Sequence, residues 1–479
     1  MNRWTGERGI RRSVGAQPGS EKTLGKKTVV VGLGVTGLWV VRYLSGQGTA
    51  VIVSEMRSEA ELDQALCDEV RTLGAVLETE GHREKTFLDA DRIVLSPGVP
   101  HDSPLLQKAR KQAIPVVGEL EMASRLTETP LIAVTGTNGK STVTELTGRL
   151  LQNAGCEVFV GGNLGTPLTA YVAEGKRADY AVVEVSSFQL DTIEKFSPLV
   201  SVLLNVSPDH LDRYDDYEAY VESKLRIYEN QRAGQYAILN DADPRLSKTA
   251  PRPGPTVLRY GPDRAEGRHA FVEGGRIHAR AGDTEWHLPL GAVHIPGKHN
   301  VENVLAVVLI ALALNIDPGV VEDTLKGFSG LPHRLEFVEE VDGRGFYDDS
   351  KATNVDAAVR AVASFDRPVI LIAGGRHKGG DYAPLVEACR GRARGAVFLG
   401  ESSGLLAKAF DRAVPFSLAK DMEEAVSVAF SRSRTGDAVL LAPACSSFDM
   451  FTDYAHRGRA FHEAVRRLIH EQGLEPRPV

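Results

Sequence analysis

The stretch Leu131-Ile-Ala-Val-Thr-Gly-Thr-Asn-Gly-Lys-Ser-Thr142 decides the fold of this chain. Its apolar, β-branched start predicts a buried strand, and the amphipathic run from Lys140 to Leu150 predicts a helix after the glycine-rich turn. The inward-pointing N–H groups of such a turn, together with the helix N-terminus, favour a bound phosphate chain. Lys140 can reach the outer phosphates, and the hydroxyl of Ser141 can bind Mg²⁺.

The match to the general P-loop pattern is incomplete at one position. Val134 stands where the pattern has its first glycine. The alternative to a phosphate site is a tight strand-to-helix turn that contains an incidental lysine. The Gly-Lys-Ser-Thr core and its flanking strand and helix patterns favour the phosphate interpretation.

Composition limits the class of protein. A length of 479 residues suggests three domains at about 150 residues each. A hydrophobic content of 42% and a charged content of 25% are typical of a soluble globular chain. The net charge of -7 gives no electrostatic basis for binding nucleic acid or an anionic membrane. The four cysteines are scattered, which argues against a disulfide framework and against a zinc site, and we expect a cytoplasmic protein.

Two segments of the sequence bear on membrane insertion and targeting. The apolar run from Val304 to Leu314 is shorter than the roughly 20 residues that span a bilayer, so we expect a buried core helix and no stable membrane insertion. Residues 1–23 are rich in arginine and glycine and lack the apolar region of a signal peptide. We expect them to form a disordered basic extension, or to result from a misassigned start codon.

The first domain is expected to span residues 24–118. A strand at Val29–Val31 leads into Gly32-Leu-Gly34-Val-Thr-Gly37, and a second strand ends before Glu55 and Arg57. This is the spacing of a dinucleotide-binding fingerprint, which alone favours a dehydrogenase. Because the motif requires only a pyrophosphate at a helix N-terminus, a UDP-sugar would also fit. Gly98 follows another strand, either as part of this crevice or as a plain turn.

The central domain, residues 119–330, alternates strand and helix patterns and predicts a parallel sheet with helices on both faces. Polar residues follow its strands, where ligands bind in such folds: Asn163, Glu184, Ser186, Asp209 and His210. Glu184 suits a Mg²⁺ ligand acting with Ser141, although an ion-paired strand end is the alternative. His210 fits a structural or a functional role equally. Lys224, judged by its helical surroundings alone, would lie on a solvated face.

The third domain, residues 331–479, repeats the doubly wound pattern, and residues 256–290 of the central domain suggest a small peripheral β-insertion. Three polar clusters follow predicted strands of the third domain, at 349–354, 374–378 and 443–448. A small anionic substrate can be held there by Thr353, Lys378 and Ser447.

The motifs together resemble a known family. The segment from Val134 to Thr142, Leu331-Pro-His-Arg334 and Asp349-Ser-Lys351-Ala-Thr-Asn354 are similar to motifs of the Mur ligases, which build the peptide stem of the bacterial cell wall. Within that family, residues 184–190, 205–214, 224–230 and 442–448 are similar to the D-glutamate-adding member. The resemblance runs from about residue 24 to the C-terminus.

The resemblance implies three α/β domains: a Rossmann-like UDP-binding domain, a central P-loop ATPase-type domain and a Rossmann-like C-terminal domain. It implies an ATP-dependent ligase that adds D-glutamate to UDP-N-acetylmuramoyl-L-alanine through an acyl phosphate and releases ADP and phosphate, in peptidoglycan synthesis. ATP and Mg²⁺ are the implied cofactors. We expect a monomer whose partners are these small molecules.

The resemblance also implies roles for individual residues. The residues expected to contact ATP are Gly136, Thr137, Asn138, Gly139, Lys140, Ser141, Thr142, Asn303, Arg334, Asp349 and Lys351. Those expected to bind the UDP substrate are Gly34, Val35, Thr36, Gly37, Glu55, Arg57, Gly98, Asn163 and Ser186. Those expected to bind D-glutamate are Thr353, Lys378, Ser447 and Phe448. The family usually has Asp where Glu55 stands.

The implied catalytic residues are Lys140, Glu184, His210 and Lys224. The implied Mg²⁺ ligands are Ser141, Glu184, His210 and Lys224, with Lys224 carbamylated by CO₂. The alternatives are another amide-forming ligase, such as a different Mur step or folylpolyglutamate synthase, a nicotinamide-dependent dehydrogenase, and a non-catalytic UDP-sugar sensor.

Overall fold

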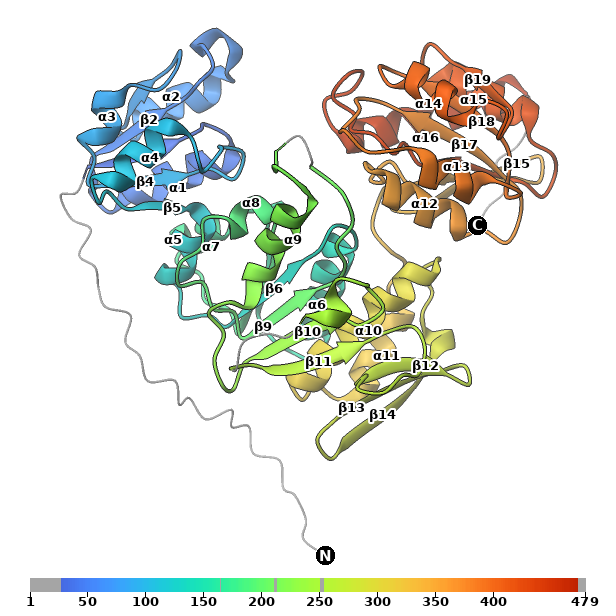
Figure 1. The fold of residues 1–479 in the computed structure, drawn as a ribbon, viewed down its shortest axis with the longest axis horizontal. Helices are drawn as coiled ribbons and strands as arrows, with labels where there is room; N and C mark the ends of the chain where they lie inside the picture. The colour runs from blue at the N-terminus through green and yellow to red at the C-terminus, as the bar shows by residue number, and fades with distance from the viewer. Residues whose placement is uncertain (1–26, 164, 211–212, 250–253, 473–479) are drawn as a thin grey trace, which may run out of the picture. The chain divides into compact units, whose positions relative to one another are not determined.

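The structure, a computed structural model, describes residues 27–163, 165–210, 213–249 and 254–472 (Figure 1). The predicted extension at residues 1–23 lies outside the described residues. The chain forms two compact units, one of Met1–Glu128 with Leu168–Gly175 and the other of Thr129–Pro167 with Lys176–Val479. We describe each unit by itself.

The first unit contains a five-stranded parallel sheet in the order β3-β2-β1-β4-β5. Alternate residues of β1 pack on opposite faces: Val30 joins the core under α1 and α2, while Val29 and Val31 join the core under α3 and α4. The strands are β1 (Thr28–Val31), β2 (Val51–Ser54), β3 (Val76–Glu78), β4 (Arg92–Leu95) and β5 (Val116–Gly118). The helices are α1 (Val35–Gly46), α2 (Gln64–Thr72), α3 (Glu84–Leu88), α4 (Pro104–Lys111) and α5 (Glu119–Leu126), with a 3₁₀ turn at Glu59–Glu61.

A further helix of the first unit, α7 (Leu168–Ala173), comes from a later part of the chain and packs against α1 and α5. Glu119, at the start of α5, is buried and accepts hydrogen bonds from the backbone N–H of Thr169, at 2.8 Å, and from its hydroxyl, at 2.7 Å. Burial raises the pKa of Glu119, and the bonds from Thr169 oppose that shift only in part.

The second unit begins with a nine-stranded sheet in the order β14-β13-β12-β11-β10-β9-β6-β8-β7. Strands β6 to β12 are parallel, and β12, β13 and β14 pair antiparallel. The predicted β-insertion therefore continues the central sheet at one edge. The strands are β6 (Leu131–Thr135), β7 (Val158–Gly162), β8 (Tyr180–Glu184), β9 (Val200–Leu203), β10 (Tyr236–Asn240), β11 (Thr256–Tyr260), β12 (Ala270–Glu273), β13 (Arg276–Ala281) and β14 (Thr284–Pro289).

Helices cover both faces of this sheet. The predicted core helix is α10 (Lys298–Ala313), and its residues from Asn303 to Ala313 are all buried. With it, α6 (Lys140–Asn153) and α11 (Pro318–Lys326) enclose the larger core, and α9 (Tyr217–Leu225) packs on the other face. A short helix, α8 (Ser187–Leu190), follows β8, and 3₁₀ turns occur at Arg226–Tyr228, Leu246–Lys248 and Leu290–Ala292.

The C-terminal part of the second unit has a six-stranded sheet in the order β15-β16-β20-β17-β18-β19, parallel except for β15. Helices α12, α13 and α14 cover one face, and α15 and α16 cover the other. The strands are β15 (Glu336–Val341), β16 (Arg344–Asp348), β17 (Val369–Gly374), β18 (Ala393–Leu399), β19 (Phe416–Leu418) and β20 (Ala438–Leu441). The helices are α12 (Val355–Ala363), α13 (Ala383–Cys389), α14 (Ser403–Phe410), α15 (Met422–Arg432) and α16 (Tyr454–Glu471).

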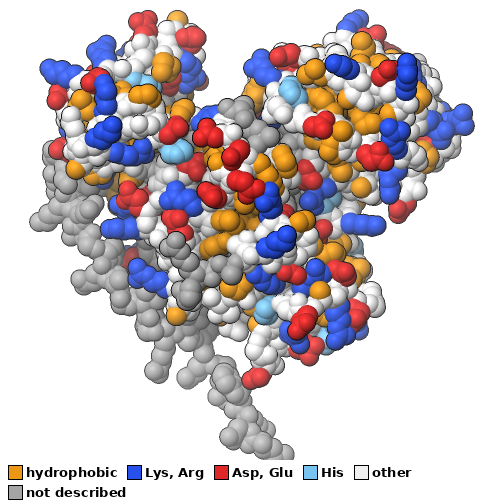
Figure 2. All heavy atoms as spheres, in the orientation of Figure 1, with side chains coloured by type: hydrophobic (Ala, Val, Ile, Leu, Met, Phe, Trp, Pro, Cys, Tyr) orange, Lys and Arg blue, Asp and Glu red, His pale blue; other side chains and the backbone are white. Residues whose placement is uncertain are grey.

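The surface carries charged side chains of both signs, as the 56 Lys and Arg and the 63 Asp and Glu residues of the sequence lead one to expect. Figure 2 shows basic and acidic side chains interspersed over the visible face of the described residues. In the described part of the chain, no helix combines the length and the apolar character that crossing a bilayer requires.

Candidate active site

The phosphate loop lies between β6 and α6, as the sequence predicts. Gly136 and Gly139 both have positive φ, at 152° and 89°. A Cβ atom at Gly139 would lie 2.3 Å from the side-chain oxygen of Asn303, so a larger residue there would force that side chain to move. Gly139 and Asn303, both predicted to contact ATP, are therefore adjacent.

Asn205, just beyond β9, holds this loop in place. Its carbonyl oxygen accepts the N–H of Thr137 at 2.9 Å, and its side-chain oxygen accepts the N–H of Asn138 at 2.8 Å. Its side-chain amide donates to the carbonyl of Asn138 at 2.9 Å. Its place directly after a strand was a signal for this role, although it was not among the predicted site residues.

Lys140 folds back over the loop that it follows. Its ammonium donates to the carbonyls of Gly136, at 2.8 Å, and Thr137, at 2.7 Å. Burial lowers the pKa of Lys140, and the nearby carboxylates of Glu184 and Asp209 oppose that shift. The ammonium is thus held against two carbonyl oxygens of the phosphate loop.

Ser141 joins three segments of the second unit. Its hydroxyl donates to Glu184 at 2.6 Å and accepts from the guanidinium of Arg334 at 2.9 Å. The other carboxylate oxygen of Glu184 accepts the side-chain amide of Asn163 at 2.8 Å. Burial opposes ionisation of Glu184, but the charge of Lys140 and these hydrogen bonds hold its pKa below the usual range. An anionic carboxylate beside a hydroxyl is a set of hard oxygen donors that fits Mg²⁺.

Lys224 is not on a solvated helix face, so the expectation drawn from its local sequence is wrong. Its side chain is buried, and its ammonium donates to the carbonyl of Gly136 at 2.9 Å, over the ring of Tyr220. Burial lowers the pKa of Lys224 well below its ordinary value, and the nearby charge of Lys140 lowers it further. The structure thus brings Lys224 against the phosphate loop.

Asp209 and His210 lie beside residues of the C-terminal segment. Asp209 accepts the side-chain amide of Asn354 at 3.1 Å, and the ammonium of Lys378 lies 3.6 Å from its other oxygen. Burial lowers the pKa of His210, whose φ of 54° is unusual for a residue other than glycine.

Ser186, another predicted site residue, caps α8 by accepting the N–H of Gln189 at 3.3 Å.

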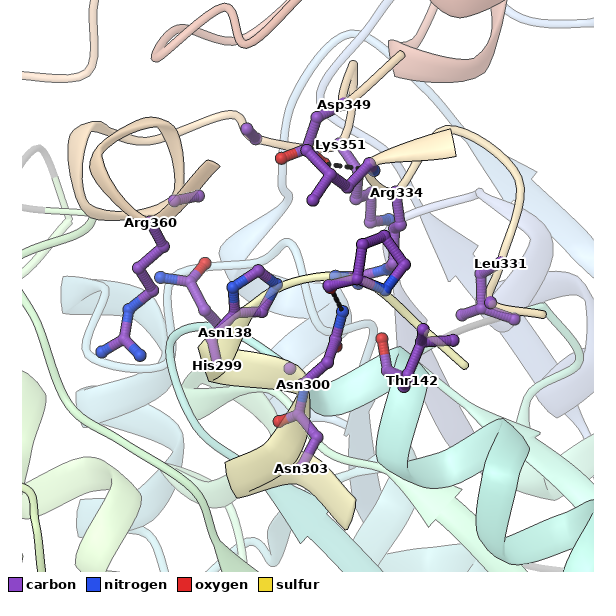
Figure 3. A pocket seen from close by; sticks show the side chains of 17 residues that line it. Asn138, Thr142, His299, Asn300, Asn303, Leu331, Arg334, Asp349, Lys351 and Arg360 are labelled. Carbon is purple, nitrogen blue, oxygen red and sulfur yellow. Dashed lines mark hydrogen bonds between the residues drawn. The ribbon is translucent and has the colours of Figure 1, made fainter. Parts of the chain in front are cut away.

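A pocket opens beside the phosphate loop, and Figure 3 shows the side chains that line it. It gathers seven of the residues predicted to contact ATP: Asn138, Gly139, Thr142, Asn303, Arg334, Asp349 and Lys351. It also contains His299, Asn300 and Arg360, which were not predicted as site residues. The Gly297-Lys-His-Asn300 stretch was a weak signal for two of them, and nothing in the sequence around Arg360 pointed to the third.

Burial shifts the pKa values of several ionisable side chains in this pocket. Burial raises the pKa of Asp349 to about 7, against the opposing effect of Arg334. It lowers the pKa of Lys351 to about 8 and that of His299 to about 4. Perturbed groups of this kind, gathered in one pocket, are typical of functional sites.

The three polar clusters of the C-terminal domain are joined by backbone hydrogen bonds. Arg376 and Ser446 exchange bonds at 2.9 and 3.1 Å, and Ala444 N–H donates to Ala352 at 2.9 Å. The loops that carry Thr353, Lys378 and Ser447 are therefore neighbours, as predicted. Ser447 is buried, whereas the side chain of Phe448 is 63% exposed.

In the first unit, the glycine motif forms the turn from β1 into α1. A Cβ atom at Gly37 would lie 2.1 Å from the carbonyl of Gly32, while one at Gly34 or Gly98 would meet no neighbouring atom. Gly34 precedes α1, which begins with Val35 and Thr36, and Val35 is 61% exposed.

Glu55 and Arg57 are tied to the same turn. Glu55 accepts the N–H of Leu33 at 2.7 Å, and Arg57 donates to both Glu55 and the carbonyl of Leu33. Burial opposes ionisation of Glu55, but the bonds from Arg57 and Leu33 outweigh it and lower its pKa to about 2.

Comparison with known proteins places these features in one family. Residues 134–311 match the Mur ligase middle domain, residues 26–118 match the MurD-like N-terminal domain of Mur ligases, and residues 333–445 match the Mur ligase glutamate ligase domain. The chain is 44% identical over 448 residues to UDP-N-acetylmuramoylalanine–D-glutamate ligase of Desulfosudis oleivorans, covering 93% of this chain and 97% of the relative. It is 43% identical to the ligase of the same name from Geobacter metallireducens, covering 93% and 98%.

Solved structures share the fold at lower identity. A pseudomurein peptide ligase type C from Methanothermus fervidus superposes with a TM-score of 0.59 at 21% identity, covering 93% of this chain and all of that one. UDP-N-acetylmuramate–alanine ligase from Thermotoga maritima gives a TM-score of 0.56 at 19% identity, covering 92% and 100%.

Proposed function

This chain belongs to the Mur ligase family, and we propose that it joins D-glutamate to UDP-N-acetylmuramoyl-L-alanine at the expense of ATP, in peptidoglycan synthesis. The observation that carries this proposal is the 44% identity to a relative of that activity over 93% of the chain. Family membership removes the dehydrogenase alternative for the glycine motif of the first unit.

The reaction needs an activated acid, because a carboxylate does not condense with an amine when oxide is the leaving group. The terminal carboxylate of the UDP substrate attacks the γ-phosphate of ATP, giving an acyl phosphate and ADP. The amine of D-glutamate then attacks the acyl carbon. Phosphate leaves, and an amide remains.

The phosphate loop supplies the ATP contacts. The backbone from Gly136 to Thr142 faces the phosphates, and Lys140 stabilises the negative charge that develops on the transferred phosphoryl oxygens. Asn303, Arg334, Asp349 and Lys351 complete the nucleotide site from the other walls of the pocket. The bond from Arg334 to Ser141 supports the placement of its guanidinium at the phosphates.

The residues for Mg²⁺ are Ser141, Glu184, His210 and Lys224 as a carbamate. When bound, the ion supplies neutralisation of phosphate charge and orientation of its oxygens. The low pKa of buried Lys224 supports the carbamate, because only a neutral amine reacts with CO₂, and the product is an anionic oxygen donor. Ser141 and Glu184, two of these residues, are hydrogen-bonded to each other.

The remaining residues bind the two other substrates. Gly34 to Gly37, Glu55, Arg57 and Gly98 hold the UDP moiety, and Asn163, Ser186 and His210 contact the muramoyl-alanine end. Thr353, Lys378, Ser447 and Phe448 hold D-glutamate, with the ammonium of Lys378 facing a carboxylate. We assign these tasks to domains at residues 24–118, 119–330 and 331–479, in a monomer that works in the cytoplasm, where ATP is made.

An ADP-release assay tests the function. Purified protein with Mg²⁺, ATP and UDP-N-acetylmuramoyl-L-alanine is offered a panel of amino acids that contains D-glutamate, L-glutamate, L-alanine and diaminopimelate. Of the amino acids in this panel, we expect only D-glutamate to cause ADP release. Release with another amino acid in its place would contradict the proposed specificity, and no release with any would contradict the proposed reaction.

A further inference from the structure

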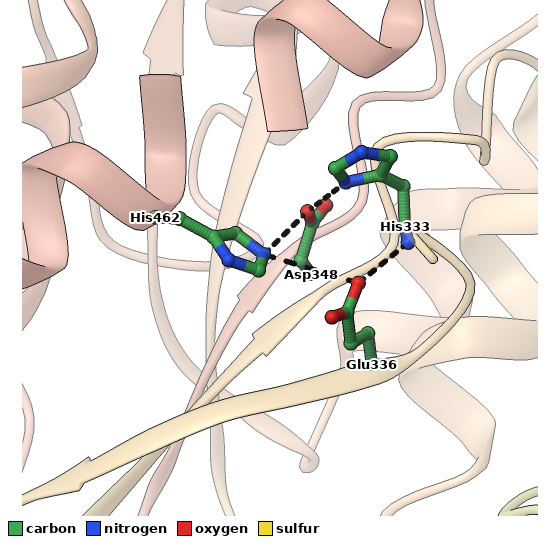
Figure 4. Close-up of side chains that lie close together, drawn as sticks. All are labelled: His333, Glu336, Asp348 and His462. Atoms are coloured by element: carbon green, nitrogen blue, oxygen red, sulfur yellow. Dashed lines mark hydrogen bonds and ion pairs between the residues drawn. The ribbon is translucent and has the colours of Figure 1, made fainter. Parts of the chain in front are cut away.

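Four side chains outside the proposed substrate contacts meet in the C-terminal domain (Figure 4). His333 precedes β15, Glu336 begins β15, Asp348 ends β16, and His462 lies on α16. The Nδ1 atom of His333 lies 2.6 Å and the Nε2 atom of His462 lies 3.0 Å from the same oxygen of Asp348. Glu336 accepts the backbone N–H of His333 at 2.7 Å.

These distances describe a hydrogen-bonded cluster. Two ligands of a tetrahedral zinc ion, each about 2.0 to 2.1 Å from the metal, are about 3.3 Å apart. The 2.6 Å separation of His333 and Asp348 is shorter, so these atoms bond to each other. Asp348 is fully buried, and its second oxygen accepts the N–H of Ser350 at 2.8 Å. The hydrogen bond that His333 donates to Asp348 also raises the pKa of His333, which favours an ion pair between them.

The cluster adjoins the backbone that carries Arg334. His333 and Leu335, on either side of it, have φ values of 61° and 47°, which side-chain-bearing residues rarely adopt. Such a conformation persists only where surrounding contacts fix it. The carbonyl of His333 accepts the N–H of Lys351 at 3.1 Å, and the N–H of Leu335 donates to Asp349 at 3.3 Å.

We propose that Asp348 and His462 are positioning residues that hold His333, and through the adjoining backbone Arg334, in place for the phosphates of ATP. The proposal rests on the proposed function, because the role of Arg334 toward ATP belongs to it. Helix α16 thereby contributes to nucleotide binding although His462 contacts no substrate.

The space for the cluster depends on Gly458 of α16. A Cβ atom there would lie 2.2 Å from Nδ1 of His333 and 2.7 Å from the Asp348 oxygen that both histidines share. A methyl group at this position would therefore displace the imidazole of His333 from Asp348. The glycine keeps the helix close enough for His462 to reach the same oxygen.

A matched pair of variants tests the role of His462. His462→Gln keeps an N–H donor at the reach of Nε2, whereas His462→Met keeps the volume and loses the donor. We expect His462→Met to weaken binding of a non-hydrolysable ATP analogue roughly tenfold, as for loss of a hydrogen bond to a charged group, and His462→Gln to bind within about twofold of wild type. The KM for D-glutamate and for the UDP substrate should stay unchanged in both.

The outcomes separate the inference from the proposed function. Equal analogue affinity in wild type and His462→Met would overturn the positioning role, as would a parallel loss in both variants or a rise in all three KM values. Analogue binding is measured at equilibrium, so it tests the inference even if wild type proves inactive as a ligase. One Zn²⁺ per chain, bound at micromolar concentration in calorimetry and lost in both variants, would show a metal site and overturn the hydrogen-bonded arrangement.

A second pair probes the glycine. Gly458→Ala should weaken analogue binding at least as much as His462→Met, because it displaces His333. Gly404→Ala, on α14, is the control, since a Cβ atom there meets no neighbour. If Gly458→Ala is folded by circular dichroism and binds the analogue like wild type, the proposal is wrong. If it does not fold, the His462 pair decides.

Discussion

The hydroxyl of Ser141 donates a 2.6 Å hydrogen bond to the carboxylate of Glu184, 43 residues along the chain. Glu184 is the last residue of β8, and Ser141 lies in the first turn of α6, the helix that follows β6. Strands β6 and β8 are adjacent and parallel, so both residues lie at the same edge of the sheet. A phosphate loop and a carboxylate thus meet at the carboxyl edge of one sheet. The predictions below begin with the residues around this pair.

Lys140→Ala is expected to lower ATP-dependent phosphate release by roughly 100-fold or more, because the charge that faces the transferred phosphoryl group is lost. Phosphate release in the presence of all three substrates measures this. Arg149→Ala, on the exposed side of the same helix, is the control and should remain active. Activity of Lys140→Ala near that of wild type would refute the role of the loop.

Lys224→Ala is expected to be inactive and to regain part of its activity with added formate or acetate, which supply the missing carboxylate oxygen. Wild type should also lose activity in buffer depleted of CO₂ and recover it with bicarbonate. Lys326→Ala, at an exposed position on α11, is the control: it should be active without added formate or acetate and should depend on CO₂ as wild type does. A wild-type enzyme that is indifferent to CO₂ would argue against the carbamate.

Lys378→Ala is expected to raise the KM for D-glutamate by roughly tenfold or more and to leave the KM for ATP within about twofold, because a charge-assisted contact to one substrate is lost. Steady-state kinetics with each substrate varied in turn measures the split. Arg376→Ala removes a cation from the same loop that pairs with Glu401, and it should leave both values unchanged. Equal effects on the two substrates would contradict the assignment.

Glu119→Gln is expected to stabilise the protein at pH 8 and to have little effect near pH 4.5. Burial raises the pKa of Glu119 above its ordinary value of about 4.5, so its contribution to stability is present below that pH and is lost as pH rises. The amide oxygen of Gln can still accept both bonds from Thr169, and Gln carries no charge. Calorimetric unfolding temperatures at the two pH values test this, with Glu145→Gln, at a more exposed position, as the control. If the difference in unfolding temperature between wild type and Glu119→Gln is the same at pH 4.5 and pH 8, ionisation of Glu119 does not destabilise the folded protein.

Much of the fold followed from local patterns. The strand, glycine turn and helix from Leu131 to Leu150 are predictable because apolar periodicity and glycine spacing act over short distances. The alternation of such units in residues 119–330 and 331–479 then implies parallel sheets, and parallel sheets bring their carboxyl ends to one edge. Ser141, Glu184 and Asn163 were predicted on that ground, and the structure brings them together.

Other features depend on contacts that no local pattern encodes. The burial of Lys224 is set by Tyr220 and by the carbonyl of Gly136, 88 residues away. Arg360 reaches the pocket from a helix with an ordinary amphipathic pattern, and Asp348 meets His462 across 114 residues. Such pairings depend on the packing of whole elements, so they appear only once the chain is folded.

The placement of α7 has a practical consequence for recombination between relatives. Leu168, Ala170 and Tyr171 are buried, and they belong to a unit formed by residues up to 128 together with residues 168–175. A chimera that exchanges only residues up to 128 would therefore pair the donor's α1 and α5 with the recipient's α7. Deletion of residues 1–128 would remove α1 and α5, the helices on which Leu168, Ala170 and Tyr171 of α7 pack. Grafting 168–175 along with the N-terminal segment keeps that small interface intact.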